Sequence, residues 1–339
     1  MDTRRKHEHL DLCAIPEVEG FVATGLESLQ LQVTSIPEVD VDAIDINISF
    51  LGRSLRAPLL IGAMTGGTEE AAVLNDRLAL AASRLGIGMA LGSQRPELAG
   101  RAPGYDVRAR APDLPLLLGN LGAVQWLKGV SVVQVSDILR RANVDGVFFH
   151  LNPLQEAIQP EGDRDFVGLT AKLAEVVPAL KVPVLIKEVG MGLSEPTLQK
   201  LAALPIAGVD VAGQGGTSFA YIEGLRAQKQ GHRFGNRLGL TFAGVGIPTA
   251  QAIPLARRYF PERLVVGSGG VRTGLDMFKC LALGANVVAL ARPFLMAARE
   301  SEAAVVELGE CLLQELRIAM AITGCRTVAD IGLERLLHA

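Results

Sequence analysis

The chain has 339 residues, of which 49% are hydrophobic and 20% charged, and its formal net charge at pH 7 is −3. This is enough apolar material for one large core, and α/β barrels of this length form a single domain. The composition excludes two function classes. Neither half carries the basic stripe that nucleic-acid binding needs, and no apolar run reaches the roughly 18 residues of a membrane span.

The N-terminus and the cysteines indicate the cellular compartment. The N-terminus is charged and has no apolar segment behind it, so we expect no signal peptide and a cytoplasmic location. Without paired spacing, the cysteines are expected to be reduced thiols rather than disulfides or a zinc site. They are Cys13, Cys280, Cys311 and Cys325.

Residues 1–55 lack the regular alternation that characterises the rest of the chain. Within them, residues 45–50 form a plausible antiparallel lid strand. We expect residues 1–55 to be an N-terminal extension that wraps or caps the main domain.

Regular strand–helix alternation begins at Pro58. We expect strands at residues 58–63, 87–91, 114–118, 146–149, 182–187, 208–211, 263–266 and 286–290. The expected helices cover 69–85, 96–110, a segment after Gly122, 165–177, 195–204, 249–259, 274–283 and the sequence beyond 290. Such alternation predicts a parallel sheet with helices outside, and eight units close a barrel. We therefore predict that residues 56–339 form a (β/α)8 TIM barrel.

An open doubly wound sheet is the alternative fold. No Gly-x-Gly-x-x-Gly fingerprint follows the first predicted strand, because the glycines of residues 62–67 have the wrong spacing.

One stretch of the predicted barrel is irregular. Residues 221–244 are rich in glycine and basic residues and have no clear periodicity. Inserts of this length in a compact barrel are usually lids or disordered. We expect this stretch to be mobile and to become ordered over the substrate; a loop at a subunit contact is the alternative.

Polar and glycine-rich residues follow every predicted strand, at the end where barrels carry their functional residues. In chain order they are residues 64–67, 92–95, 119–120, 150–156, 187–188, 213–218, 267–272 and 291–293. Eight such groups at one end of a barrel are hard to explain as helix caps. We therefore predict a binding site at this end.

The group after the fourth strand reads His-Leu-Asn-Pro-Leu-Gln-Glu, from His150 to Glu156. Asn152 and Pro153 force a turn where the strand ends. A histidine, two amides and a carboxylate then leave the strand together, an arrangement suited to gripping a polar ligand. A turn whose polar groups only cap the next helix is the alternative.

The glycines at 267, 269 and 270 predict a phosphate site. Their backbone N–H groups can approach a phosphate, and the following helix directs its positive end to the same place. A phosphate site after the last two strands recurs in barrels. A tight turn without a ligand is the alternative.

Lys187 ends an apolar strand, and burying its charge unpaired would cost several kcal/mol. We therefore expect a partner for the ammonium. A reduced flavin fits, because the ammonium can stabilise negative charge near N1 and C2 of the ring. A pair with Glu188 is the alternative, although neighbours along a strand point to opposite faces.

These groups, together with Arg5, Lys6 and His9, resemble those of the type 2 isopentenyl-diphosphate Δ-isomerases, the FMN-dependent enzymes of isoprenoid biosynthesis. The resemblance extends from Arg5 to about Ala297, and its most discriminating motif is His-x-Asn-x-x-Gln-Glu at residues 150–156. It implies an isomerase that interconverts isopentenyl and dimethylallyl diphosphate by a 1,3-allylic proton shift. It also implies FMN active in its reduced form, Mg²⁺, NADPH as reductant, and a homo-oligomer (tetramer or octamer).

The resemblance also implies roles for individual residues. The FMN ring and ribityl chain would contact Ala63, Met64, Thr65, Ser93, Asn120, Lys187 and Thr217. The FMN phosphate would contact Gly269, Gly270, Val271, Ala291 and Arg292. The substrate would meet Arg5, Lys6, His9, Ser93, Gln94, Arg95, His150, Asn152 and Gln155, so the extension would contribute to the substrate site. Glu156 would bind Mg²⁺, and the expected catalytic residues are Gln155, His150 and Lys187.

The implied reaction needs one proton delivered at C4 of the substrate and another removed from C2. No convincing acid–base pair of Glu, His or Cys can be placed near the apolar end of the pocket, and reduced FMN, able to exchange a proton at N5, would fill that role.

Two alternatives remain for the function. One is an FMN-dependent oxidase or dehydrogenase. Against it, residues 213–218 contain no histidine base, and no loop cysteine lies between Cys13 and Cys280. The other is an idle phosphate-binding barrel that acts as a scaffold.

Overall fold

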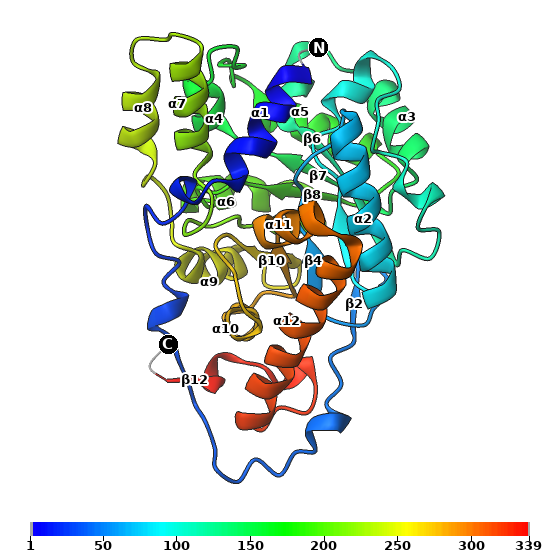
Figure 1. The fold of residues 1–339 in the computed structure, drawn as a ribbon, viewed down its shortest axis with the longest axis vertical. Helices are drawn as coiled ribbons and strands as arrows, with labels where there is room; N and C mark the ends of the chain where they lie inside the picture. Colours follow the sequence, from blue (N-terminus) through cyan, green and yellow to red (C-terminus); the bar gives the residue numbers. More distant parts are fainter. Residues whose placement is uncertain (1–2, 338–339) are drawn as a thin grey trace.

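The computed structural model describes residues 3–337, and its centre is a closed barrel of eight parallel strands (Figure 1). Around the barrel, the strands neighbour one another in the order β10-β11-β4-β5-β6-β7-β8-β9. Their bounds are β4 Leu59–Ile61, β5 Gly88–Ala90, β6 Leu116–Gly122, β7 Gly146–His150, β8 Val184–Lys187, β9 Gly208–Asp210, β10 Leu264–Ser268 and β11 Val287–Leu290. The predicted (β/α)8 barrel is confirmed, and each predicted strand overlaps an observed one.

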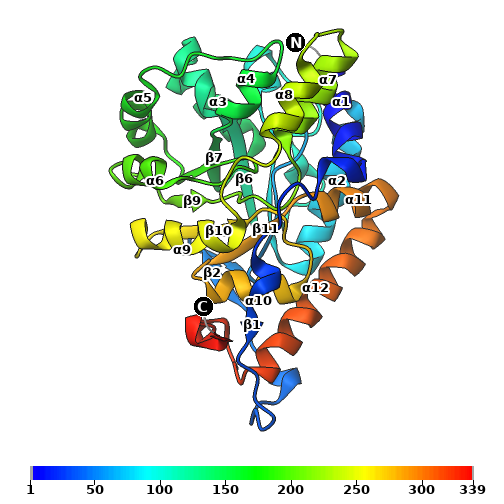
Figure 2. The same cartoon turned by 90° about the vertical axis from the view of Figure 1, so that its left-hand side faces the viewer.

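Helices cover the outside of the barrel on both sides (Figure 2). They are α2 Glu69–Leu85, α3 Val132–Ala142, α4 Pro153–Ile158, α5 Leu169–Val176, α6 Glu195–Ala202, α7 Phe219–Lys229, α8 Gly235–Phe242, α9 Thr249–Tyr259, α10 Gly274–Ala282, α11 Arg292–Glu300 and α12 Glu302–Ile322. Local sequence sets their ends. At α2, the Thr68 hydroxyl accepts from the Ala71 N–H, and Gly86 takes the left-handed conformation that stops the helix.

Barrel strands are buried on both faces, as expected for a parallel sheet covered by helices. Inward-facing side chains such as Leu60, Leu118 and Phe148 form one cluster inside the barrel. Their neighbours along the strands, such as Ile61 and Val147, pack beneath the helices in a second, larger cluster.

The antiparallel strand predicted over residues 45–50 exists, but it is not a lid over the binding site. It is β2 Ile48–Phe50, which pairs with β3 Arg53–Leu55. Phe50 and Leu55 pack into the cluster inside the barrel. Arg53 Nη2 lies 2.6 Å from Oδ1 of Asp145, the residue just before β7. The hairpin therefore plugs the amino-terminal end of the barrel, opposite to the carboxyl ends of the strands.

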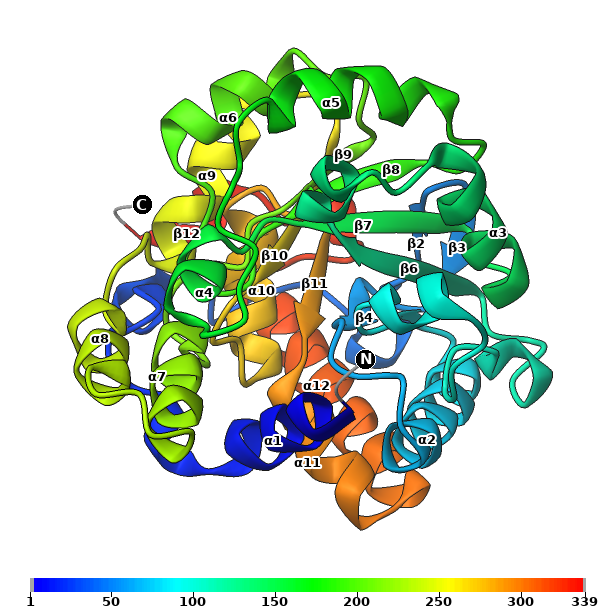
Figure 3. The ribbon, with the colours of Figure 1, turned by 90° about the horizontal axis from the view of Figure 1, so that it is seen from above.

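The start of the extension is more regular than expected. Residues Thr3–Ala14 form α1, which lies along the rim of the barrel beside α11, between α7 and α2 (Figure 3). The chain then runs along the outside of the barrel to the other end (Figure 1). There β1, Gln30–Leu31, pairs with β12, Leu336–Leu337.

The expectation that residues 221–244 are irregular is wrong, because α7 and α8 fill most of this stretch as a helical hairpin. Gly224 and Gly239 lie at the contact between the two helices. A Cβ on Gly224 would come within 2.6 Å of the Gly239 Cα. The glycines that weaken helix propensity here serve close helix packing instead.

Three other predicted helices differ from the observed elements. Residues 96–110 contain two short 3-10 turns, Arg95–Ala99 and Val107–Ala109, and the segment after Gly122 begins as a 3-10 turn, Ala123–Lys128. Beyond α12 the chain is not helical but ends in 3-10 turns and β12. Within residues 3–337, no helix is both long and apolar enough to cross a membrane.

Candidate active site

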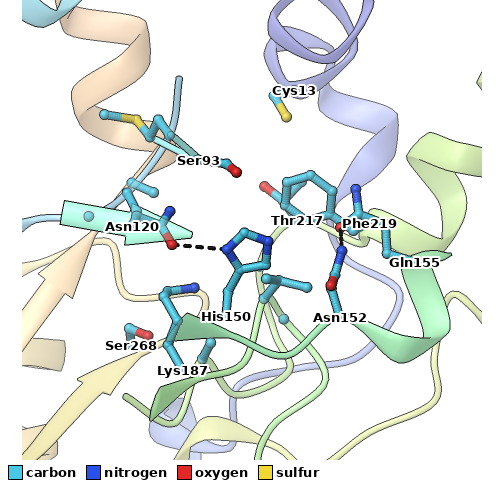
Figure 4. Close-up of a pocket in the computed structure, with 18 of the residues that line it drawn as sticks. Cys13, Ser93, Asn120, His150, Asn152, Gln155, Lys187, Thr217, Phe219 and Ser268 are labelled. Atoms are coloured by element: carbon cyan, nitrogen blue, oxygen red, sulfur yellow. Dashed lines mark hydrogen bonds between the residues drawn. The ribbon is translucent and has the colours of Figure 1, made fainter. Parts of the chain in front are cut away.

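A cavity of about 260 Å³ opens at the carboxyl ends of the barrel strands, beneath α1 (Figure 4). It brings together every predicted site residue except Gln94. Its lining includes Arg5, Lys6, His9, Ala63, Met64, Thr65, Ser93, Arg95, Asn120, His150, Asn152, Gln155, Glu156, Lys187, Thr217, Gly269, Gly270, Val271, Ala291 and Arg292.

The structure places Gln94 outside this lining, so the cavity gives no support to its prediction as a substrate contact. Its side chain is fully buried, and Oε1 accepts from the Asn120 N–H at 3.1 Å. Gln94 is the N-cap residue of the 3-10 turn Arg95–Ala99; Ser93 and Arg95 on either side of it line the cavity, while Gln94 does not. Gln94 instead fixes the backbone that carries Asn120.

His150 stands at the end of β7, and its Nδ1 lies 2.9 Å from the Oδ1 of Asn120 (Figure 4). Burial, reinforced by the charges of Lys187, Lys6 and Arg5, lowers the pKa of His150 to about 3. The imidazole is therefore neutral at pH 7. When Nδ1–H donates its hydrogen bond to Asn120, Nε2 is unprotonated and can accept a hydrogen bond in the cavity.

The polar groups of α4 bond to one another rather than capping the helix. Asn152 occupies the N-cap position but makes no side-chain capping bond. Its Nδ2 donates to Gln155 Oε1 at 3.0 Å and to Glu156 Oε1 at 3.1 Å. Glu156 Oε2 accepts from the Asp163 N–H at 2.7 Å. The alternative of a simple capping turn does not fit this geometry.

A buried acid that the sequence analysis missed, Glu223 on α7, supports this group. Its Oε1 accepts from Gln155 Nε2 at 2.8 Å and pairs with His9 Nε2 at 2.7 Å. Its Oε2 accepts from Arg226 Nη1 at 2.5 Å. Burial alone would raise the pKa of Glu223, but the bonds from His9 and Gln155 and the charge of Arg226 lower it to about 2. The only sequence signal was a Glu-x-x-Arg spacing inside the stretch taken as irregular.

Cationic side chains also line the cavity. Lys6 Nζ donates to the Ser93 carbonyl at 3.3 Å. Burial, and then the neighbouring charges of Arg5 and Arg95, lower the pKa of Lys6 to about 7. Arg95 has a partner, because its Nη1 lies 3.4 Å from Asp163 Oδ2. This concentration of positive charge favours an anionic ligand.

At the end of β8, Lys187 is buried and its Nζ donates to the Glu188 carbonyl. The Glu188 carboxylate is engaged elsewhere, because Oε2 accepts from the N–H groups of Val189, Gly190 and Met191. Lys187 pairs in register with Asp210 of β9, whose carboxylate accepts from Ser268 Oγ at 2.5 Å. Burial raises the pKa of Asp210. The alternative of a Lys187–Glu188 side-chain pair is therefore not what the geometry shows.

The glycine-rich loops after β9 and β10 form a cradle with no room for side chains. A Cβ on Gly216 would come within 2.8 Å of the Gly270 nitrogen, and a Cβ on Gly270 within 2.4 Å of Thr24 Cγ2. Gly269 and Gly270 have φ values of 107° and 69°, which favour glycine. Backbone N–H groups in such a cradle suit a phosphate, so these residues fit the phosphate end of a flavin nucleotide.

The structure modifies the prediction for Arg292. Its guanidinium does not lie free in the cradle, because Nε donates to the Cys13 carbonyl at 2.8 Å and Nη2 to the Ala14 carbonyl at 3.0 Å. The side chain thus holds the end of α1.

An apolar wall of the cavity was also missed. It consists of Leu10, Cys13, Val124, Phe219 and Leu295. Burial raises the pKa of the Cys13 thiol to about 12, so it contributes as a neutral group. Residues 5, 6, 9, 10 and 13 have the spacing of one helix face, a signal from which α1 and its cavity face could have been predicted.

Comparison with known proteins first defines the class. The sequence profile of the FMN-dependent dehydrogenase family matches residues 154–338. Among solved structures, a mandelate oxidase mutant with the monooxide FMN adduct has a TM-score of 0.67 and 18% identity, covering 96% of this chain and 94% of that one. A flavocytochrome b2 mutant has a TM-score of 0.70 and 20% identity, covering 99% and 83%. The structural likenesses show the shared fold, and the profile match shows an FMN-dependent barrel.

Sequence relatives then define the particular family. "Isopentenyl-diphosphate delta-isomerase" of a Synechococcus species is 47% identical over 94% of this chain and 92% of its own length. The protein of the same name from Deinococcus radiodurans is 44% identical, covering 96% of each chain. The chain belongs to the isopentenyl-diphosphate delta-isomerase family, which the motif resemblance had indicated.

Proposed function

We propose that this enzyme interconverts isopentenyl and dimethylallyl diphosphate by a 1,3-allylic proton shift in the cavity beneath α1. The observation that carries the proposal is that one cavity holds two sets of groups. A glycine cradle and Lys187 line it, and so do cationic side chains and apolar side chains. Such a cavity suits a flavin nucleotide and a small diphosphate ester together. The names of the relatives support the choice of substrate.

The diphosphate would bind to the cationic cluster. Arg5, Lys6 and Arg95 supply positive charge, and charge-assisted bonds to phosphate are among the strongest available to side chains. Neutral His150 and the amide of Asn152 add hydrogen bonds of fixed direction. Ser93 and His9 complete the predicted contacts from the loop after β5 and from α1.

Mg²⁺ would bind at Glu156. Its carboxylate lines the cavity and is oriented by Asn152 and by the Asp163 N–H. Within residues 3–337, no three acidic, histidine or cysteine side chains form a metal cluster. A magnesium ion at Glu156 would take its other ligands from the diphosphate and water, as this ion usually does in phosphate sites.

FMN would lie along the strand ends. The cradle of Gly269, Gly270 and Val271, with Ala291 and the backbone of Arg292, would hold its phosphate. Its ring and ribityl chain would contact Ala63, Met64, Thr65, Ser93, Asn120, Lys187 and Thr217. When bound in its reduced form, the cofactor would supply acid–base chemistry without net redox change.

The chain's own catalytic contribution would be positioning and charge control. Gln155 cannot act as a strong base, because a neutral amide has no suitable pKa. It is held from both sides, by Asn152 and by Glu223, and would orient the substrate against the apolar wall. His150, neutral and fixed by Asn120, would hold the substrate without adding charge. Lys187 would keep a positive charge beside the cofactor.

The finer expectations of the sequence remain part of this proposal. They are NADPH as the reductant, a cytoplasmic location and a homo-oligomer of four or eight chains.

Reductant use tests the proposal against an oxidoreductase. We expect the oxidised enzyme to be inactive until NADPH or dithionite reduces it, and then to complete many turnovers per reduction. In deuterated water, the dimethylallyl product should carry label in the methyl derived from C4. Reductant consumption that rises in step with product would contradict the isomerase assignment. A colourless protein that takes up no FMN would favour the scaffold alternative.

A further inference from the structure

The N-terminal extension is fastened to the rim of the cavity by Glu19, which follows the 3-10 turn Pro16–Val18. Glu19 Oε2 lies 3.0 Å from Arg292 Nη1, and its Oε1 accepts from Arg272 Nη2. The Thr217 hydroxyl lies 3.5 Å from the same Oε1. This one carboxylate therefore joins the extension to the loops that follow β9, β10 and β11.

Arg292 extends this connection to the end of α1. The guanidinium that binds Glu19 through Nη1 also donates to the carbonyls of Cys13 and Ala14, in the last turn of the helix. A cation at this position satisfies carbonyls that lack helical partners and interacts well with the helix dipole. Because the guanidinium is planar and its donors are fixed, the Glu19 contact also sets the direction of its bonds to α1.

The direction of α1 determines what its side chains reach. Arg5, Lys6 and His9 lie on the face that lines the cavity. At the far end of the helix, Lys6 Nζ donates to the Ser93 carbonyl at 3.3 Å, and between the two ends Glu8 and His9 bind Arg226 and Glu223 of α7. A hinge movement at the Ala14 end would displace Arg5 and Lys6 more than His9, because they lie more than two turns away along the helix.

We propose that Glu19 is a positioning residue that docks α1 through Arg272 and Arg292 and so presents Arg5 and Lys6 to the diphosphate. This inference rests on the proposed function, because it takes the diphosphate as the ligand of these two side chains. Glu19 is not itself a phosphate ligand, since its carboxylate is negative and lies beside the glycine cradle. Its effect on the substrate passes through α1.

The first test is the E19Q variant of the FMN-loaded enzyme, which removes the charge and keeps the shape. We expect KM for isopentenyl diphosphate to rise about tenfold and kcat to stay within about twofold, the pattern of lost binding without lost chemistry. Glu17→Gln is the matched control, because Glu17 is exposed and only two residues away. It should leave both constants unchanged.

The second test measures α1 directly, by tryptic cleavage after Arg5 and Lys6 in the FMN-loaded enzyme without substrate. E19Q should be cleaved several-fold faster than the wild type and E17Q, while the flavin absorbance of the protein is retained. Arg272→Gln breaks one of the two arginine contacts that Glu19 makes, so it should have a smaller effect in the same direction. The E19Q/R272Q double variant should be cleaved no faster than E19Q alone, because E19Q already breaks the contact that R272Q removes.

Unchanged cleavage of E19Q would overturn the proposal, and so would loss of FMN in step with the rise in KM. Lys6→Ala separates this inference from the proposed function. If K6A leaves KM unchanged, the diphosphate assignment fails, and the cleavage assay still decides whether Glu19 docks α1. If K6A raises KM and E19Q does not, the role of Glu19 fails alone.

Discussion

At the scale of single residues, Lys6 shows how the cavity is prepared for an anion. Burial, Arg5 and Arg95 together lower its pKa to about 7, against 10.5 for an ordinary lysine. Without a ligand, the ammonium is therefore close to losing its proton at neutral pH. A diphosphate beside it would favour the charged form and raise the pKa again.

This pKa predicts a pH dependence of substrate binding. Binding needs the protonated lysine, whose pKa in the free enzyme is about 7, so affinity should be full below pH 7 and fall above it. We expect KM for isopentenyl diphosphate to rise by up to about tenfold per pH unit above pH 7. Lys6→Arg keeps its charge and should give a flatter profile between pH 7 and 9.

Exposed Lys200 provides the control for that experiment, since K200R should reproduce the wild-type profile. If K6R and the wild type lose affinity in parallel as pH rises, another group controls binding.

Much of the site could be predicted residue by residue, because parallel strands bring their carboxyl ends together whatever the details of the loops. Ser93, Asn120 and Lys187 were found by that rule. The same rule could not exclude Gln94, because the backbone angles of a turn decide which of its side chains face the cavity. Glu223 could not be found at all, because its importance comes from tertiary contacts with His9 and Gln155.

At the scale of elements, one buried arginine joins α1 and α7 to the segment that follows α4. Arg226 on α7 has no exposed surface and pairs with Glu8 of α1 at 3.0 Å and with Glu223 of its own helix at 2.5 Å. It also pairs with Glu161, just beyond α4, at 2.8 Å. The elements that carry His9 and Gln155 thereby share one charged centre.

Removing a partner from a buried pair should cost far more than removing an exposed one. Glu223→Ala leaves the buried guanidinium undercompensated and should lower the free energy of unfolding by about 3–5 kcal/mol. Glu161→Ala is the matched control; its partner is the same arginine, but its side chain is 42% exposed. It should cost about 1 kcal/mol or less. Urea denaturation of both variants measures the difference, and equal losses would contradict the argument.

The elements themselves were predictable to different degrees. The barrel strands and α2 stand out because apolar periodicity and end signals agree, as at Thr68 and Gly86. The α7–α8 hairpin was missed because Gly224 and Gly239 have poor helix propensity, and only packing explains them. The extension was missed as a helix because α1 is mostly polar and is stabilised by contacts with distant segments.

At the scale of the whole molecule, the two ends of the barrel have different roles. The carboxyl ends of the strands carry the cavity, and the amino ends are filled by the β2–β3 hairpin. Phe50 is 1% exposed and packs with the side chains inside the barrel. Stability and binding should therefore be separable.

Phe50→Ala tests this separation. It leaves a cavity inside the barrel and should lower the free energy of unfolding by about 3–5 kcal/mol. KM for the substrate at 25 °C should stay within about twofold, because the change lies at the opposite end from α1. Ile36→Ala, at a side chain that is 79% exposed, should change neither quantity. A KM that rises with the loss of stability would show that the two ends are coupled.

The docking of α1 also has a consequence for biosynthesis. The helix leaves the ribosome long before its partners, because the guanidinium that holds its end belongs to a residue 278 positions later than Ala14. Its other anchors, Glu223 and Arg226, also lie in the second half of the chain. During translation, α1 therefore stays undocked until these later residues have been synthesised. The helix that covers the cavity is therefore made before the barrel strands but can dock only after Arg292 has been made.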